Sequence, residues 1–400
     1  MLPCQRALFD IPREVAYLNA ASYSPLPLAV QEAGRRGVAR KGRPWLVDQA
    51  FALAQHERAR AAAARLIDAQ PAEVALVSSI AYGVASAGKA LVLAPGARVL
   101  VLEDDHSSPV LEWMVRQEAG GFKVETVARP ADGDWTAAVL GAIARGGAAP
   151  VALASLSAVH WADGVSIDLH AIKTALDAFG AALFVDATQS VGVLPLSVRA
   201  LDPDFVAFPT YKWLLGPYGR AFLYVAERHH DKVPLEQTSH GRRAVRAEQL
   251  RYFTDTRYVA DARRFDMGER DHFISLEMAA IGMEMMATWG SAAVAERIGA
   301  LSARLVAGLE GLDVALAEGR VRAPHIVSLA FPAGLPDRLM HELSVDQVYV
   351  APRLGRLRIS PHVYNDEEDI ERCARALRRR LPRASGRAAA SACARSASRT

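Results

Sequence analysis

The sequence predicts an α/β protein whose large domain is built on a mainly parallel sheet and is followed by a small α+β domain. The first observation is a set of short apolar runs, of which 181–185 is the clearest, because such runs are typical of strands buried on both faces. The second is that helical patterns, such as 169–179, separate these runs. The third is size, since 400 residues, 51% of them hydrophobic, suffice for two domains.

The elements follow one another in a regular order. Strands are expected from Tyr17 onward and over 74–78, 98–102, 151–155, 181–185, 204–208, 326–331, 348–351 and 353–360. Helices are expected over 27–38, 45–66, 81–91, 169–179, 275–289, 292–309 and 366–379. Over 353–360 the arginines alternate with apolar residues, which predicts a strand with one wet face. Residues 227–262 are charged and indicate an exposed segment.

We therefore expect four parts: an N-terminal segment (1–16), a large domain (17–264), a small C-terminal domain (265–381) and a tail (382–400). The tail is rich in Ala, Ser and Arg, and this low complexity predicts disorder. No internal repeat stands out along the chain.

Charge and cysteine usage exclude several classes of protein. The formal net charge is only +3, which gives no reason to expect a nucleic-acid partner. Three cysteines with no CxxC pair favour a reduced, cytoplasmic setting. No stretch approaches eighteen uncharged apolar residues and the N-terminus lacks the apolar core of a signal peptide, so we expect neither a membrane span nor secretion.

An acid and an amine follow two neighbouring strands of the predicted sheet. Asp186 ends the run 181–185, and Lys212 follows the run 204–208 by four residues. Open α/β sheets bind ligands at the carboxyl ends of their strands, so both side chains can reach one crevice. A lysine that forms a Schiff base and an acid that keeps a pyridine nitrogen protonated suit pyridoxal 5′-phosphate (PLP). A helix-capping Asp and a solvated Lys are the commoner explanation of such a pair.

The run VDATQSVG…DFVAFPTYKWLLGPYGRAFLYV resembles the signature of the class V (NifS-like) PLP-dependent aminotransferase family. Within that family, YKWLLGP is most similar to isopenicillin N epimerase-like proteins, alongside cysteine desulfurase-like ones. The resemblance extends from about Tyr17 to about Leu377. It implies the PLP-dependent transferase fold of type I with a seven-stranded-type sheet, PLP on Lys212, an α-amino acid substrate, a homodimer and no metal.

By the same resemblance, several residues would hold the cofactor. The phosphate would lie on the turn at Ser79, Ile80 and Ala81, where a helix N-terminus offers free N–H groups. Thr210 and Tyr211 match further phosphate contacts, and Gly268 matches a residue that reaches the phosphate of the partner subunit. Its neighbour Glu269 is given no role, because an acid is an unusual neighbour for phosphate.

The resemblance also assigns residues to the cofactor ring. His106 falls where the family stacks a histidine or another aromatic residue on the ring. Gln189 would bond the phenolic oxygen. Several relatives add an asparagine at the position of Ala158, so this chain departs from them there, and His160 or Trp161 is a candidate for the same wall.

On the substrate side, the arginine of LRISPHVYN, Arg358, matches the family residue that binds the substrate carboxylate. A planar guanidinium can give a carboxylate two parallel hydrogen bonds. Arg353 is a second candidate. Asn19, in the small-residue loop YLNAASYSPL, is a third by resemblance alone.

Catalysis would proceed through Lys212, Asp186 and His106, and several outcomes stay open. We rank transamination and C–S or C–C cleavage above epimerisation. Desulfuration is disfavoured, because it needs a cysteine on the loop before the substrate arginine and residues 320–358 contain none. A nucleotide-dependent dehydrogenase is disfavoured, because no GxGxxG motif follows any early strand of this sequence. A PLP-fold binding protein without catalysis is the remaining alternative.

Overall fold

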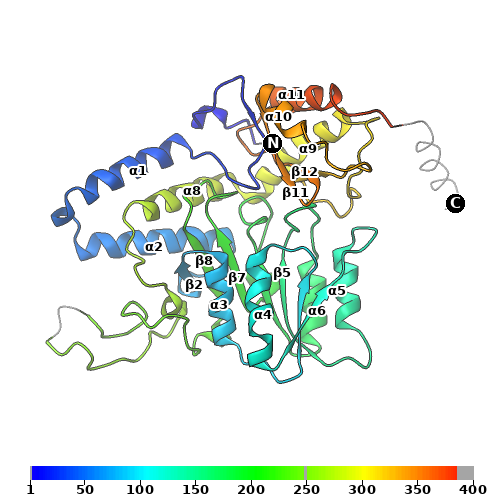
Figure 1. Cartoon of the computed structure of the whole chain (residues 1–400). Coiled ribbons are helices and arrows are strands. Elements are labelled where there is room, and N and C mark those ends of the chain that lie inside the picture. Colours follow the sequence, from blue (N-terminus) through cyan, green and yellow to red (C-terminus); the bar gives the residue numbers. More distant parts are fainter. Residues whose placement is uncertain (1, 247–249, 385–400) are drawn as a thin grey trace.

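The computed structural model describes residues 2–246 and 250–384. Its centre is a seven-stranded sheet with the order β2-β8-β7-β6-β5-β3-β4 (Figure 1). These strands are β2 (Val74–Val77), β3 (Arg98–Leu102), β4 (Lys123–Val127), β5 (Val151–Ser157), β6 (Ala182–Asp186), β7 (Phe205–Pro209) and β8 (Ala221–Val225). β7, β6, β5, β3 and β4 are mutually parallel, and β8 runs antiparallel to both β2 and β7. The prediction of an α/β fold with a mainly parallel sheet is confirmed.

Helices cover both faces of this sheet, which is why its strands are nearly all apolar. In the first half of the chain the helices are α1 (Leu28–Lys41), α2 (Gln49–Leu66), α3 (Ile80–Ala90), α4 (Ser107–Gly120), α5 (Trp135–Ile143), α6 (Leu169–Asp177) and α7 (Val198–Leu201). α3 and α4 contribute to the core on one face, around Trp113. α2, α5, α6 and the later helix α8 (Ser275–Trp289) contribute to the core on the other face.

The C-terminal part forms a smaller unit with its own core. Its elements are α9 (Ser291–Gly308), β9 (Val327–Leu329), α10 (Leu339–Val345), β10 (Val348–Tyr349), β11 (Ala351–Arg353), β12 (Arg356–Ile359) and α11 (Glu367–Arg378). β11, β12 and β9 form an antiparallel sheet, and β10 pairs in parallel with β1 (Ala16–Tyr17). The N-terminal strand is thereby packed into the core of the C-terminal unit, and α8 packs with the large sheet. The exact domain bounds stay a prediction.

Among the predicted boundaries that differ from the structure, three are informative. The expected strand 353–360 is a hairpin, because Leu354 and Gly355 turn the chain with φ of 48° and 72°. The expected helix 45–66 begins only at Gln49, where the Asp48 side chain caps the N–H of Phe51. The tail was expected to be disordered from 382, but residues 382–384 bond to 311–313. The rest of that tail lies outside the described residues.

Within the described residues, no helix is long and apolar enough to span a bilayer. The two cysteines that the structure describes, Cys4 and Cys373, are free thiols.

Candidate active site

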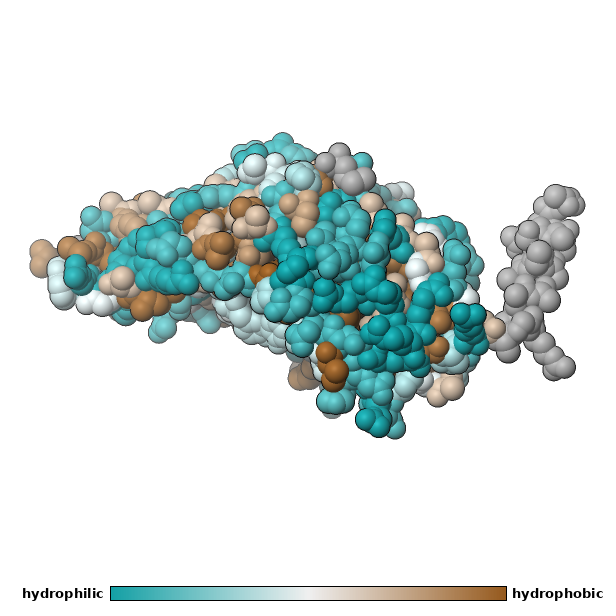
Figure 2. Space-filling view, turned by 90° about the horizontal axis from the view of Figure 1, so that it is seen from above, coloured by the Kyte–Doolittle hydropathy of each residue, from teal (hydrophilic) through white to brown (hydrophobic). Residues whose placement is uncertain are grey.

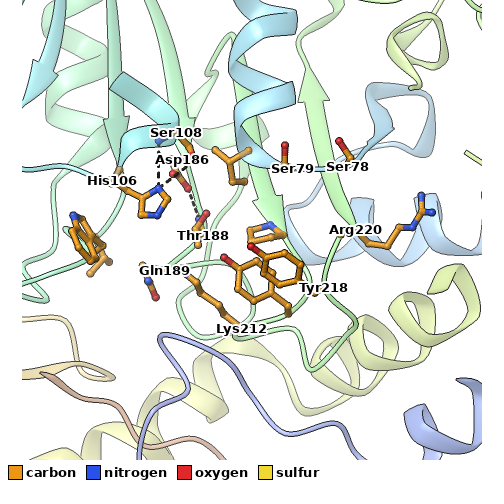
Figure 3. A pocket seen from close by; sticks show the side chains of 17 residues that line it. Ser78, Ser79, His106, Ser108, Asp186, Thr188, Gln189, Lys212, Tyr218 and Arg220 are labelled. Carbon is orange, nitrogen blue, oxygen red and sulfur yellow. Dashed lines mark hydrogen bonds between the residues drawn. The ribbon is translucent and has the colours of Figure 1, made fainter. Parts of the chain in front are cut away.

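One cavity opens at the carboxyl ends of the central strands, with about 730 Å³ of free space that is partly open to solvent. Seven of the predicted site residues line it (Figure 3): Ser79, Ile80, His106, Asp186, Gln189, Tyr211 and Lys212. They come from the turns after β2, β3, β6 and β7. The crevice expected at the strand ends is therefore present, and it gathers residues that lie up to 133 positions apart in the chain.

Lys212 lies on a tightly closed loop between β7 and β8. The N–H of Thr210 donates to Arg220 O (3.0 Å) and the N–H of Gly216 donates to Thr210 O (2.9 Å), which ties the ends of the loop together. A side chain at Gly216 would come within 2.7 Å of Thr210, so glycine is required there. The Lys212 amine is buried by this arrangement. Burial, reinforced by the positive charge of Arg358, lowers the pKa of Lys212 to about 7, although Asp186 opposes the shift. Near neutral pH much of the amine is uncharged and nucleophilic.

Asp186 is the last residue of β6 and is only 3% exposed. Its Oδ1 accepts a hydrogen bond from the N–H of Thr188 (2.9 Å), which fixes the carboxylate at the floor of the cavity (Figure 3). Asp186 is paired with Ala207 on β7, the strand that leads to Lys212. The acid and the amine are thus held by adjacent strands of one rigid sheet.

His106 precedes α4 and acts as its N-cap. The N–H of Ser108 donates to His106 Nδ1 (3.3 Å), so the neutral ring carries its proton on Nε2. Burial lowers the pKa of His106, which favours that neutral form. The ring meets Trp161 edge-on, with ring centres 5.7 Å apart. His106 therefore presents a flat, neutral ring at the cavity wall.

Asp105 fixes the backbone at His106 through hydrogen bonds. Its Oδ1 accepts from the N–H of His106 (2.7 Å) and from the hydroxyl of Ser157 (2.8 Å). Burial raises the pKa of Asp105 to about 6. Sequence reasoning passed over Asp105, although it lies next to a predicted site residue.

Gln189 lies between the cavity and the protein interior. Its Oε1 accepts from Trp213 Nε1 (2.7 Å) and its Nε2 donates to Ala21 O (3.1 Å). The amide orientation is therefore fixed, and one N–H of Nε2 remains to serve a ligand.

Two arginines of the C-terminal hairpin converge on one hydroxyl. Nη2 of Arg358 and Nη2 of Arg353 donate to Ser22 Oγ at 2.8 and 2.7 Å. Arg358 Nη1 also donates to the carbonyl of Trp161 (2.6 Å), a residue of the cavity wall, while its Nε is buried without a partner. The prediction that the arginines of the expected strand 353–360 face solvent is wrong for Arg358, which is only 1% exposed.

Neither arginine forms an ion pair with an acid among the described residues. Burial, reinforced by the charge of Arg353, lowers the pKa of Arg358 to about 9. Two guanidinium groups without a counter-ion favour binding of an anion, and the geometry suits a carboxylate.

The remaining predicted residues, like Arg353 and Arg358, do not line the cavity. The Thr210 hydroxyl donates to Pro217 O (2.7 Å) and so stabilises the lysine loop. The N–H of Gly268 donates to Glu236 of the same chain (2.6 Å). Asn19 forms a backbone bridge to Ser360 next to the arginine hairpin, and Ala81 lies one residue inside α3.

His160 and Trp161 were both candidates for the part of the cavity wall near Ala158, and only one of them lies there. Trp161 lines the cavity, whereas His160 is buried and stacks on Trp135, with ring centres 5.1 Å apart. Several lining residues were not anticipated: Ser78, Ser108, Ser157, Thr188, Tyr218 and Arg220. The first four lie within a few positions of a predicted residue, which was the available signal, whereas Tyr218 and Arg220 lie six and eight positions after Lys212.

A family model for aminotransferase class-V matches residues 45–373. The chain belongs to this family. It is similar to an uncharacterized aminotransferase, YcbU, of Bacillus subtilis, with 29% identity over 80% of this chain and 82% of that protein. It is also similar to a kynureninase of Salinispora tropica, with 28% identity over 57% of each chain. Among solved structures, the apo cysteine desulfurase of Thermococcus onnurineus has a TM-score of 0.81 at 20% identity, covering 95% of this chain and 98% of that one, which supports the same fold.

Class V aminotransferases are PLP-dependent enzymes, and the cavity fits this cofactor. It offers an amine with a pKa near 7, a buried carboxylate and a flat neutral imidazole. Ser79 and the start of α3 add hydroxyl and N–H donors for a phosphate. The donor set thus has a group for each polar part of PLP.

Proposed function

We propose that this class V enzyme acts on an α-amino acid, by transamination or by cleavage of a C–S or C–C bond. The observation that carries the proposal is the buried amine of Lys212, whose pKa lies near 7, in the same cavity as the strand-end carboxylate of Asp186. An amine that is partly uncharged at neutral pH can bond a carbonyl carbon and can accept a proton from a substrate α-carbon.

Each residue of the cavity has a proposed task. Lys212 would hold the cofactor and, once released, would move the proton at the substrate α-carbon. Asp186 would keep the pyridine nitrogen protonated, and His106 would stack on the ring. When bound, PLP supplies an electron sink for the bonds at that α-carbon. Gln189 would donate its free N–H to the phenolic oxygen.

The phosphate would be held at the start of α3. Ser79 Oγ already accepts from the N–H of Tyr82 (3.1 Å), which leaves its hydroxyl proton to donate. The N–H groups of Ile80 and Ala81 belong to the first turn, where no carbonyl of the helix can reach them. Tyr211, on the cavity wall, is a further candidate.

The substrate carboxylate would bind to Arg358, with Arg353 as a second donor. Both guanidinium groups meet at Ser22 and neither has an acid partner within the described part of the chain. Asn19 lies on the same N-terminal loop and remains a weaker candidate. A substrate carboxylate would relieve the repulsion between the two cations.

Persulfide transfer is a poor fit, although several relatives are named cysteine desulfurases. Residues 320–358 contain no cysteine. Cys373 is fully buried, and burial raises the pKa of its thiol to about 12. Within residues 2–246 and 250–384, neither a mobile nor an activated thiol is therefore available near the arginines.

We further propose a homodimer located in the cytoplasm. Large apolar side chains are exposed where α1 and α2 project from the molecule: Val38, Trp45, Leu46 and Leu53 (Figures 1 and 2). Exposed apolar groups of this kind favour association. Gly268 would then lie near the partner's cavity. Light scattering at micromolar concentration tests this, and a fully active monomer of 43.1 kDa would contradict it.

A product analysis tests the reaction type. The holoenzyme is incubated with individual amino acids, each with and without a second 2-oxo acid that can accept the amino group, and the products are followed by mass spectrometry. A 2-oxo acid that keeps the whole side chain indicates transamination, and a shortened product indicates a lyase. Inversion at the α-carbon alone would indicate the epimerase instead. If PLP binds and no amino acid reacts, the chain is a binding protein and the proposal fails.

A further inference from the structure

The predicted phosphate seat is poorer in hydroxyl groups than the resemblance implies, because Ile80 and Ala81 follow Ser79. Backbone N–H groups and neutral hydroxyl groups would then carry a group that has about −1.5 to −2 charge near neutral pH. A buried cation at the same end of the cavity would compensate for this.

Arg220 is such a cation. It lies between Gly219 and the first residue of β8, lines the cavity and is only 6% exposed. Figure 3 shows its side chain on the same side of the cavity as Ser78 and Ser79 and away from His106. Its Nη1 is fully buried and has no hydrogen-bond partner. The residue forms no ion pair with any acid in 2–246 or 250–384.

The guanidinium group of Arg220 is held by a short chain of neutral groups. Its Nε donates to Ser275 Oγ at 2.6 Å, and Ser275 Oγ lies 2.9 Å from His272 Nδ1. The N–H of Ser275 also donates to that Nδ1 (3.1 Å), so Nδ1 is an acceptor and the serine hydroxyl donates to it. Burial, with the charge of Arg220, lowers the pKa of His272, which favours the neutral ring.

This chain orients the guanidinium group without neutralising it. Burial alone lowers the pKa of Arg220 to about 10. A buried arginine with no counter-ion and a free Nη1 is costly unless an anion binds there.

We propose that Arg220 is a phosphate-binding residue, which supplies the charge that the turn at Ser79 lacks. The proposal rests on PLP being the cofactor. It predicts that the contribution of Arg220 depends on the phosphate group and not on the rest of the cofactor.

The test compares PLP with pyridoxal, which lacks the phosphate. Equilibrium binding of both to the cofactor-free full-length protein is measured by absorbance or fluorescence quenching. Arg220→Leu should weaken PLP binding by about 10- to 100-fold and leave pyridoxal binding within about twofold of wild type. Arg220→Lys should keep part of the preference for PLP, because it keeps the charge.

Arg322→Leu is the matched control. Arg322 is half-buried, burial lowers its pKa, and it has no acid partner among the described residues, but it does not line the cavity. This variant should bind both compounds as wild type does. Inorganic phosphate should also compete with PLP more weakly in Arg220→Lys than in wild type, which keeps the proposal testable if Arg220→Leu does not fold.

The proposal is overturned if Arg220→Leu loses PLP and pyridoxal equally, which would indicate a role in shape or subunit contact. It is also overturned if PLP binding is unchanged, or if phosphate competes equally well with Arg220→Lys. A wild-type protein that binds neither PLP nor pyridoxal would instead refute the proposed function.

Discussion

The proposed site has two parts, the lysine wall (Asp186 and Lys212) and the arginine wall (Arg353 and Arg358), and they are assembled in different ways. Asp186 and Lys212 lie at the ends of the adjacent strands β6 and β7, where the sheet fixes their positions. Arg353 and Arg358 reach the site from a hairpin and meet Ser22, which is 336 positions from Arg358. The first wall is built into the core of the large sheet, whereas the second depends on how two distant segments pack. Damage to the first should therefore affect the chemical step, and damage to the second should affect substrate binding.

Replacing the amine should have the largest effect. Lys212→Ala removes both the attachment point of the cofactor and the proposed base at the α-carbon, so turnover should fall by at least about 10²- to 10⁴-fold. The visible absorption of bound PLP should be lost as well. Lys173→Ala is the control, because Lys173 is equally buried but pairs with Asp177 outside the cavity. A yellow, active Lys212→Ala protein would refute the assignment.

Substitutions in the arginine wall should weaken substrate binding. Arg358→Ala should raise the KM of the responding amino acid by about 10- to 100-fold, because a charge-assisted contact is worth roughly 1.5–3 kcal/mol. Arg353→Ala should have a smaller effect, since Arg353 is less deeply buried than Arg358. The kcat should change less than KM in both variants. If the corresponding decarboxylated amine binds wild type as well as the amino acid does, the arginines do not read a carboxylate.

Asp186→Asn is a milder change in the lysine wall than Lys212→Ala. The amide keeps the shape of the carboxylate but not its charge, so the protein should still bind cofactor. Turnover should fall by about one to two powers of ten, from a loss of roughly 1.5–3 kcal/mol. In contrast to Arg358→Ala, the decrease should appear in kcat, with KM little changed. Steady-state kinetics of the two variants side by side measure this difference, and equal kcat values for Asp186→Asn and wild type would remove Asp186 from the mechanism.

The same contrast explains what the sequence could and could not predict. The apolar runs around β6 and β7 predicted the sheet and its strand ends, so the positions of Asp186 and Lys212 followed from local pattern and resemblance. The hairpin was misread because Leu354, a residue that rarely adopts positive φ, begins its turn. The convergence of Arg353 and Arg358 on Ser22 depends on long-range packing, which no local pattern encodes.

Arg220 illustrates the same limit. An arginine between a glycine and an apolar strand is ordinarily a surface residue, and nothing in the run GPYGRAF indicates burial. Only the fold shows that its guanidinium group is enclosed and bonded to Ser275. The strand β4 was missed although the sequence carries a signal for it. Lys123 and Glu125 alternate with apolar Val124, a pattern typical of a strand with one exposed face, and β4 pairs with β3 as the edge strand.

The smallest expected effect of replacing Lys212 is on the stability of the cofactor-free protein. It tests whether the lysine wall buries a charged amine. In the unfolded chain the amine of Lys212 has its ordinary pKa of 10.5, whereas burial lowers the pKa to about 7 in the folded protein. Between these values the unfolded chain binds more protons, so the contribution of Lys212 to the free energy of unfolding increases as pH rises from about 7 to about 10. Below about pH 7 both states are protonated and the full cost of burying the charge remains.

Lys212→Met should therefore be more stable than wild type near pH 6, by a few kcal/mol at most, and the difference should shrink toward pH 10. Denaturant unfolding of both cofactor-free proteins at about pH 6, 8 and 10 and constant ionic strength measures it. Lys173→Met, which loses an ion pair with Asp177 instead of an unpaired buried charge, should be destabilised at every pH. A difference between Lys212→Met and wild type that does not vary between about pH 6 and 10 would mean that the amine has the same pKa in the folded and unfolded states. Burial would then not lower the pKa of Lys212, and an amine that is partly uncharged near neutral pH would not be available to move a proton.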